Sequence, residues 1–88
     1  MSGTPINVLF FKPGDQTTIN MQLTDGMMFA EVAYKYFGKA GIDQTKDDPK
    51  FLFNSKELKT DSYKSLADLG IKNMSRIDVV IGKDVIGA

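Results

Sequence analysis

The first quarter of the chain alternates apolar and polar residues with a period of two on either side of a turn. A Pro-Gly-Asp sequence at residues 13–15 separates the two runs. Side chains two positions apart in a strand lie on the same face, and Pro-Gly-Asp favours a tight turn. The pattern therefore predicts a β-hairpin with one face toward the core. The residues expected on that face are Ile6, Val8, Phe10, Ile19, Met21 and Leu23.

The period changes to three and four residues in the next segment. The apolar residues that follow this spacing are Phe29, Val32, Ala33, Tyr36 and Phe37. They form one stripe of an amphipathic helix. Lys39 suits the negative pole of the helix dipole, and Gly41 can adopt the left-handed conformation that ends a helix. We predict a helix from Met27 to Ala40, with Thr24-Asp25-Gly26 supplying capping side chains.

Shorter elements follow in the second half of the chain. Residues 42–50 are predicted to form a polar loop. FLFN at 51–54 predicts a short strand, and SKEL at 55–58 predicts a turn that leads into a still shorter strand. SLADLGI, which begins at residue 65, predicts a helical turn capped by its serine, and RIDVVI at 76–81 predicts the last strand. The residues expected to face the core here are Phe51, Phe53, Ile77 and Val79.

The predicted order is strand, strand, helix, strand, strand, short helix, strand. A late strand can pair beside the first, which gives an α+β fold with a five-stranded mixed sheet. One main helix covers one face of this sheet. We expect the first and last strands to be adjacent and parallel.

Composition narrows the classes of function. The 88 residues are enough for one domain, with 42% apolar and 25% charged residues, as in ordinary globular proteins. Eleven basic and eleven acidic residues cancel, so no general attraction to nucleic acid or acidic membranes is predicted. The chain has neither a membrane-length apolar run nor the pattern of a signal peptide. We expect an intracellular monomer whose partners are proteins.

The absence of two residue types bears on catalysis. The chain contains no cysteine and no histidine, which removes the thiol nucleophile, the commonest general base and the commonest metal ligands. We predict that the chain is not an enzyme and binds no cofactor. The acidic residues Asp43, Asp47 and Asp48 lack the glycine and closing glutamate of a calcium loop, so we predict no metal site.

The order and several segments together resemble ubiquitin and its relatives, the β-grasp family that includes the SUMO-type modifiers. The resemblance spans Ile6 to Ile81 and is strongest in FLFNSKEL, in KSLADLGI and in the spacing from Ile71 through KNMSR to IDVVI. The helix FAEVAYKYFGKAGI is more similar to the SUMO type. The resemblance implies a ubiquitin-like domain at residues 6–82, an N-terminal extension at 1–5 and a C-terminal tail at 83–88.

The tail departs from the pattern of conjugated relatives. Those proteins end in Gly-Gly, whereas Gly82 here is followed by Lys83 and the chain has no Gly-Gly. An activating enzyme has a narrow channel for this terminus, and branched or charged side chains are bulkier there than glycine. The resemblance therefore implies a non-covalent protein-interaction module. The alternative is a processed ubiquitin- or SUMO-type modifier whose conjugation motif is absent from this sequence.

The resemblance also implies where partners bind. It places the first, last and third strands side by side, and their outward residues then become neighbours on the face without the helix. Leu52 and Val80 match two aliphatic positions of ubiquitin's main recognition patch, Lys56 matches a nearby lysine, and Asp78 replaces a histidine. The predicted partner-binding residues are Leu9, Lys50, Leu52, Lys56, Asp78 and Val80, with Phe11 beside them.

A second surface is the groove between the second strand and the helix. In SUMO-type proteins a partner strand adds to the sheet edge at this groove. Lys35 and Lys39 are expected to flank it here.

Overall fold

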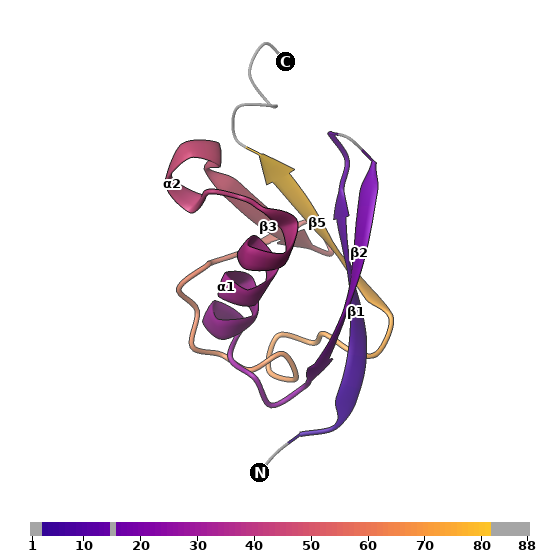
Figure 1. Cartoon of the computed structure of the whole chain (residues 1–88). Coiled ribbons are helices and arrows are strands. Elements are labelled where there is room, and N and C mark those ends of the chain that lie inside the picture. The colour runs from indigo at the N-terminus through magenta and orange to yellow at the C-terminus, as the bar shows by residue number, and fades with distance from the viewer. Residues whose placement is uncertain (1–2, 15, 82–88) are drawn as a thin grey trace.

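The computed structural model describes residues 3–14 and 16–81 and contains one mixed sheet with one main helix (Figure 1). The predicted α+β class is confirmed. The elements are β1 (Pro5–Lys12), β2 (Thr17–Thr24), α1 (Phe29–Ala40), α2 (Gln44–Asp47), β3 (Pro49–Phe53), β4 (Lys56–Leu58) and β5 (Ser75–Ile81).

The five strands lie in the order β2-β1-β5-β3-β4. β1 and β2 form the predicted antiparallel hairpin, with Val8 opposite Met21. β1 and β5 are parallel neighbours, as expected, and Phe10 lies opposite Ile77. β3 is antiparallel to both β5 and β4.

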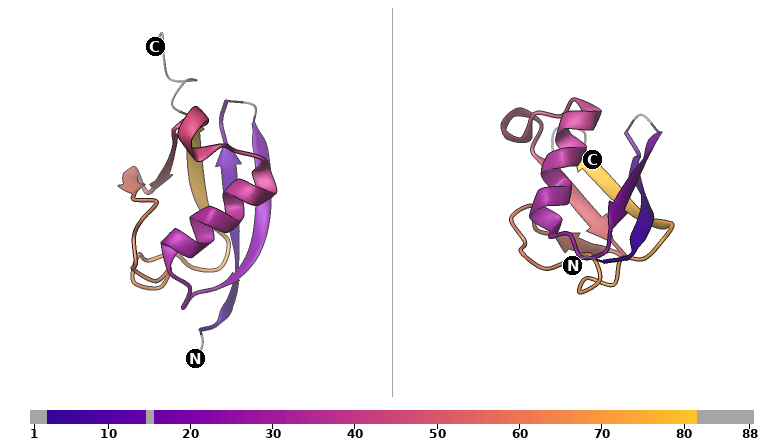
Figure 2. Two further views of the ribbon diagram at one scale, coloured as in Figure 1. Left: turned by 60° about the vertical axis from the view of Figure 1, so that its left-hand side comes forward. Right: turned by 60° about the horizontal axis from the view of Figure 1, so that its bottom comes forward.

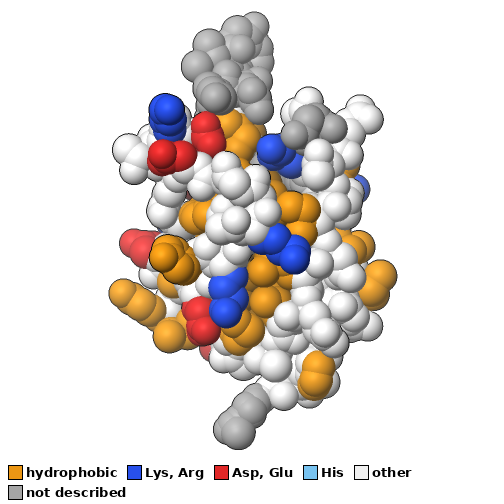
Figure 3. Space-filling view, viewed as in Figure 1, with side chains coloured by type: hydrophobic (Ala, Val, Ile, Leu, Met, Phe, Trp, Pro, Cys, Tyr) orange, Lys and Arg blue, Asp and Glu red, His pale blue; other side chains and the backbone are white. Residues whose placement is uncertain are grey.

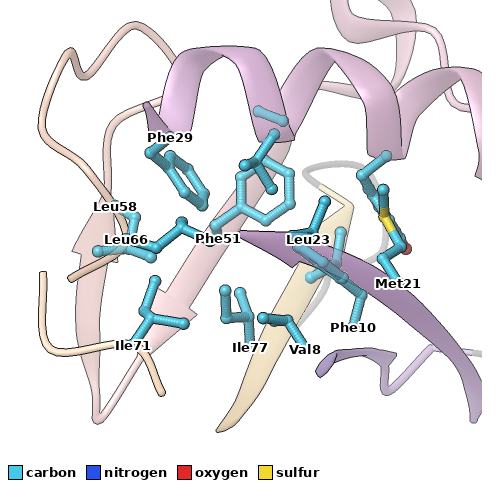
Figure 4. Packing of buried hydrophobic residues seen from close by; sticks show 14 of the residues in the cluster. Val8, Phe10, Met21, Leu23, Phe29, Phe51, Leu58, Leu66, Ile71 and Ile77 are labelled. Carbon is cyan, nitrogen blue, oxygen red and sulfur yellow. The ribbon is translucent and has the colours of Figure 1, made fainter. Parts of the chain in front are cut away.

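Helix α1 lies across one face of the sheet, and Figure 2 shows that the described chain leaves the other face open. Aromatic rings fill the space between the helix and the sheet. Phe10 stacks on Tyr36 with 4.6 Å between ring centroids, and Phe51 meets Phe29 edge-on at 5.2 Å. Such pairs stabilise a core by about 0.5–1.5 kcal/mol beyond the burial of their area. Figure 4 shows the labelled core residues of β1, β2, β3 and β5 gathered on the side of the sheet that faces the helix.

Two residues predicted for the core are only partly buried. Ile19 and Phe53 pack against the core cluster but keep some exposed surface. Both lie near the end of a strand, where neighbouring elements cover less of the side chain. Residues that strand periodicity does not assign complete the core, among them Leu58, Leu66 and Ile71.

The ends of α1 differ in how well the sequence predicts them. Gly41 has φ 70° and ends the helix, as predicted. At the other end the helix begins at Phe29, two residues after the approximate start predicted at Met27, and the prediction of a side-chain cap from residues 24–26 is wrong. Instead the N–H of Phe29 donates to the carbonyl of Lys64 at 2.9 Å, and that of Ala30 donates to Ser62 at 2.9 Å. A loop distant in sequence therefore supplies the cap.

The expected polar loop at 42–50 contains a short helix, α2, so the prediction of a plain loop is wrong. The Asp43 carboxylate accepts hydrogen bonds from the N–H groups of Thr45 at 2.9 Å and Lys46 at 3.1 Å, which is an N-cap. In the predicted helical turn, the Ser65 hydroxyl accepts from the N–H of Asp68 at 3.1 Å. That segment closes a single turn and does not continue as a helix.

Polar side chains hold the N-terminal part of β1 to distant segments. The Thr4 N–H donates to the Asp25 carboxylate at 2.7 Å, which ties residue 4 to the segment after β2. The N–H of Asn7 donates to the side-chain carbonyl of Asn73 at 2.8 Å. The segment that precedes β5 is thus held against β1. None of the helices in the described part of the chain is long and apolar enough to cross a membrane.

Candidate functional site

The open face of the sheet presents one residue in two from each strand. Phe11 lies opposite Asp78, and Asp78 lies opposite Leu52, so these side chains form one row across β1, β5 and β3. Leu9 lies opposite Arg76, and Val80 opposite Lys50. Leu9, Phe11, Leu52 and Val80 are all half-buried. We call the surface formed by Leu9, Phe11, Lys50, Leu52, Arg76, Asp78 and Val80 the open-face patch.

A charged pair interrupts the apolar part of this patch. The Arg76 guanidinium lies 5.3 Å from the centroid of the Phe11 ring, and its Nε lies 3.2 Å from Asp78 Oδ1. The Arg76 side chain is 63% exposed and that of Asp78 is 35% exposed. Cation–π and ion-pair contacts at such exposure each contribute at most about 1 kcal/mol. The pair nevertheless interrupts the apolar surface, because Asp78 lies between Phe11 and Leu52 and Arg76 lies beside Leu9.

The Asp78 carboxylate is incompletely satisfied. Its Oδ1 is buried and accepts no hydrogen bond within the described residues, although Arg76 Nε is close enough for an ion pair. The distance meets the range of a salt bridge, but the direction of approach does not make a hydrogen bond. A buried carboxylate oxygen without a donor is costly.

The predicted lysines occupy different places. Lys50 is exposed on β3, and its Nζ lies 3.5 Å from the Asp48 carboxylate. Lys56 lies opposite Phe53, so by strand alternation it is Glu57, opposite Leu52, that shares the row of the patch. Glu57 and Arg76 are not among the residues predicted from the sequence. Counting by two from Asp78 assigns Arg76 to the same face, so a signal for Arg76 was present.

The patch is hollowed at one end. A depression of about 530 Å³ lies between the β3–β4 turn and the segment before β5. Leu52 and Asp78 form part of its wall, and Asn54, Lys72 and Arg76 supply polar groups. A partner side chain that packs on Leu52 can therefore meet both charged and amide groups nearby.

The second surface predicted from the sequence is a real groove. A hollow of about 440 Å³ lies between β2 and α1, and Met21, Leu23 and Met27 contribute apolar walls. Lys35 and Lys39 line it from the helix. Figure 3 shows hydrophobic side chains between the helix and β2 with lysine side chains beside them.

The acidic loop uses its carboxylates for local hydrogen bonds. Asp43 caps α2, and Asp47 accepts a hydrogen bond from the Asp43 N–H at 3.1 Å. Within residues 3–14 and 16–81, no three acidic side chains are placed so that they could hold a metal ion. The tail that bears on conjugation, residues 82–88, lies outside the described residues.

Comparison with known proteins identifies the fold. No protein-family model and no curated protein matches the sequence. Solved structures do match. The UBL domain of yeast Ddi1 has a TM-score of 0.78 at 16% identity, covering 90% of this chain and 91% of that domain. The ubiquitin of Caldiarchaeum subterraneum has a TM-score of 0.76 at 10% identity, covering 89% and 94%.

A third match is a part of a longer chain. A chain in the crystal structure of ATBAG1 in complex with HSP70 has a TM-score of 0.72 at 20% identity, and the match covers 86% of this chain but 40% of that chain. The strand order, the single crossing helix and these neighbours define the ubiquitin-like β-grasp fold. The chain therefore has the ubiquitin-like fold that the sequence resemblance implied.

Proposed function

We propose that this domain is a non-covalent protein-interaction module that binds its partners through the open-face patch. The observation that carries the proposal is the position of Leu52 and Val80, which lie on the sheet face opposite the helix and outside the core cluster. Half-buried aliphatic side chains gathered on one face supply the centre of a small interface. The open sheet itself supplies a flat, rigid surface.

The charges of the patch set the kind of contact. Lys50 and Arg76 already have acidic neighbours, so they orient a partner and add little affinity while hydrated. The patch is small beside a standard interface, so binding is transient, with Kd in the micromolar range or weaker. We therefore propose a module that acts in brief encounters or next to other binding sites.

Affinity capture with matched variants tests this proposal. Leu52→Ala and Val80→Ala remove patch contacts, and each should weaken binding by about 1–2 kcal/mol. Tyr34→Ala is the control, because Tyr34 is exposed on the helix, away from the patch. Proteins captured by the wild type and by Tyr34→Ala, but not by the patch variants, support the proposal. Amide chemical-shift mapping with a purified partner then locates the site.

The groove between β2 and α1 is a second candidate surface for the same function. Its hollow and its two lysines favour an extended acidic segment that adds beside β2. Lys35→Glu with Lys39→Glu should then abolish capture, while Leu52→Ala leaves it unchanged. Shifts that cluster on β2 and around Lys35 contradict the open-face proposal.

A further inference from the structure

One outer edge of the sheet has none of the features that keep edge strands apart. β2 ends the sheet, and within the described residues only β1 pairs with it. Its sequence TTINMQLT contains no charged residue, no proline and no glycine, and its pairing with β1 runs without a bulge. Natural edge strands are protected by lysines, prolines or bulges because a long, regular edge pairs readily with another strand.

The opposite edge is protected in these ways. β4 has three residues, and two of them, Lys56 and Glu57, are charged. β2 has eight residues in one unbroken register. The difference between the two edges indicates that β2 is the edge able to accept another strand.

The hydrogen-bond ladder determines which groups of β2 point outward. The Asp25 N–H donates to the Thr4 carbonyl, so at this pair the backbone groups point between the two strands. One residue pair in two does so in an antiparallel ladder. In agreement, the Asn7 carbonyl points away from β2 and accepts from the Met74 N–H. The residues of β2 whose N–H and C=O turn away from β1 are Thr18, Asn20, Gln22 and Thr24, and the Thr24 carbonyl accepts from the Met27 N–H.

We propose that a second copy of this chain pairs with this edge, antiparallel, about a two-fold axis at Met21. In that register Asn20 of one copy faces Gln22 of the other, and each pair exchanges both backbone hydrogen bonds. Ile19 of one copy faces Leu23 of the other, so apolar residues meet on the helix side and amides on the open side. Matched cross-strand pairs of this kind stabilise a sheet, and the same patch on both copies is what a two-fold interface requires.

The groove and its lysines set the strength of this dimer. The two-fold axis is perpendicular to the sheet, so both helices lie on one side and the two grooves beside β2 merge. Lys35 and Lys39 of the two copies then approach across the merged groove. Their repulsion is screened by salt. One strand pair buries less than a standard interface, so we expect a Kd on the order of 0.1–1 mM that falls as salt is added.

Sedimentation and NMR diffusion over a concentration series test the pairing. From about 0.02 to 2 mM protein, the apparent mass should rise toward that of a dimer, more so at high salt. Amide shifts that change with concentration should cluster at residues 18–24. A monomer at the highest concentration overturns the proposal, and so do concentration-dependent shifts centred on Leu52.

Paired charge variants test the register. Asn20→Lys with Gln22→Lys places like charges opposite each other, whereas Asn20→Lys with Gln22→Glu places opposite charges together in this register alone. Both positions are exposed, so both variants should fold, which thermal melting checks. At low salt the first variant should have a Kd at least about tenfold higher than the second. Equal dimerisation of the two variants contradicts the register. Leu52→Ala should leave dimerisation unchanged, which separates this inference from the proposed function.

Discussion

Phe51 and Leu52 are neighbours on β3 and belong to opposite faces of the sheet. Phe51 is fully buried, and its ring contacts those of Phe10, Phe29, Tyr36 and Phe37. Leu52 is half-buried in the row that it shares with Asp78. The same backbone thus carries a residue that holds the domain together and one that remains available to a partner. Strand alternation separates stability from recognition in this molecule.

The largest effect is expected on the helix-covered face. Phe51→Ala removes the ring at the centre of the aromatic cluster and leaves a cavity that the packed neighbours cannot fill. The free energy of unfolding should fall by about 3–5 kcal/mol, measured by chemical denaturation. A loss below about 1 kcal/mol would mean that the cluster is not the centre of the core.

Phe53 is intermediate in burial between Phe51 and an exposed side chain, so its replacement should have an intermediate effect on stability. Sequence periodicity assigns it to the core, but the structure leaves it partly exposed near the end of β3. Phe53→Ala should therefore cost about 1–2 kcal/mol, clearly less than Phe51→Ala. The two variants can be compared in the same denaturation series. Equal losses would place Phe53 in the core after all.

On the open face, Leu52→Ala should change the free energy of unfolding by less than about 1 kcal/mol. The Leu52 side chain is not part of the hydrophobic core cluster, so its truncation removes little core packing. Thermal and denaturant unfolding should both remain close to the wild type. An unfolded or strongly destabilised variant would show that the open face is needed for stability. It would contradict the assignment of stability and recognition to opposite faces of the sheet.

The smallest effect is expected for Arg76→Gln. This change removes the charge next to Asp78 and the cation above Phe11. The Arg76 side chain is 63% exposed, so solvent screens both contacts and stability should change by about 0.5 kcal/mol or less. The contribution of Arg76 to the free energy of unfolding should also decrease at high salt. Chemical denaturation of the wild type and the variant at two ionic strengths measures this decrease. A loss above about 2 kcal/mol would indicate that the pair has a structural role.

The candidate site could be predicted in part. Alternation along β1, β3 and β5 is a local property of the strands, and it assigns Leu9, Leu52 and Val80 to the face opposite the core. The contact between Arg76, Phe11 and Asp78 joins β5 to β1. This contact depends on the pairing register of the two strands and on the direction of the long Arg76 side chain. Neither can be predicted from the sequence of one strand alone.

By itself the sequence determined the elements whose cause is local. The β1–β2 hairpin follows from period two around a turn, and the body of α1 from its apolar stripe. Its end at Gly41 follows from a conformation that glycine adopts at little cost. Together with the resemblance to ubiquitin, these elements were enough to reach the α+β class.

Only the tertiary structure decided how the elements are fastened together. The start of α1 is set by the carbonyls of Ser62 and Lys64, and β1 is tied to the segment before β5 by Asn73. Each of these bonds joins backbone groups to residues more than thirty positions away. Local periodicity carries no information about such partners, because their closeness arises only after the sheet and helix have packed.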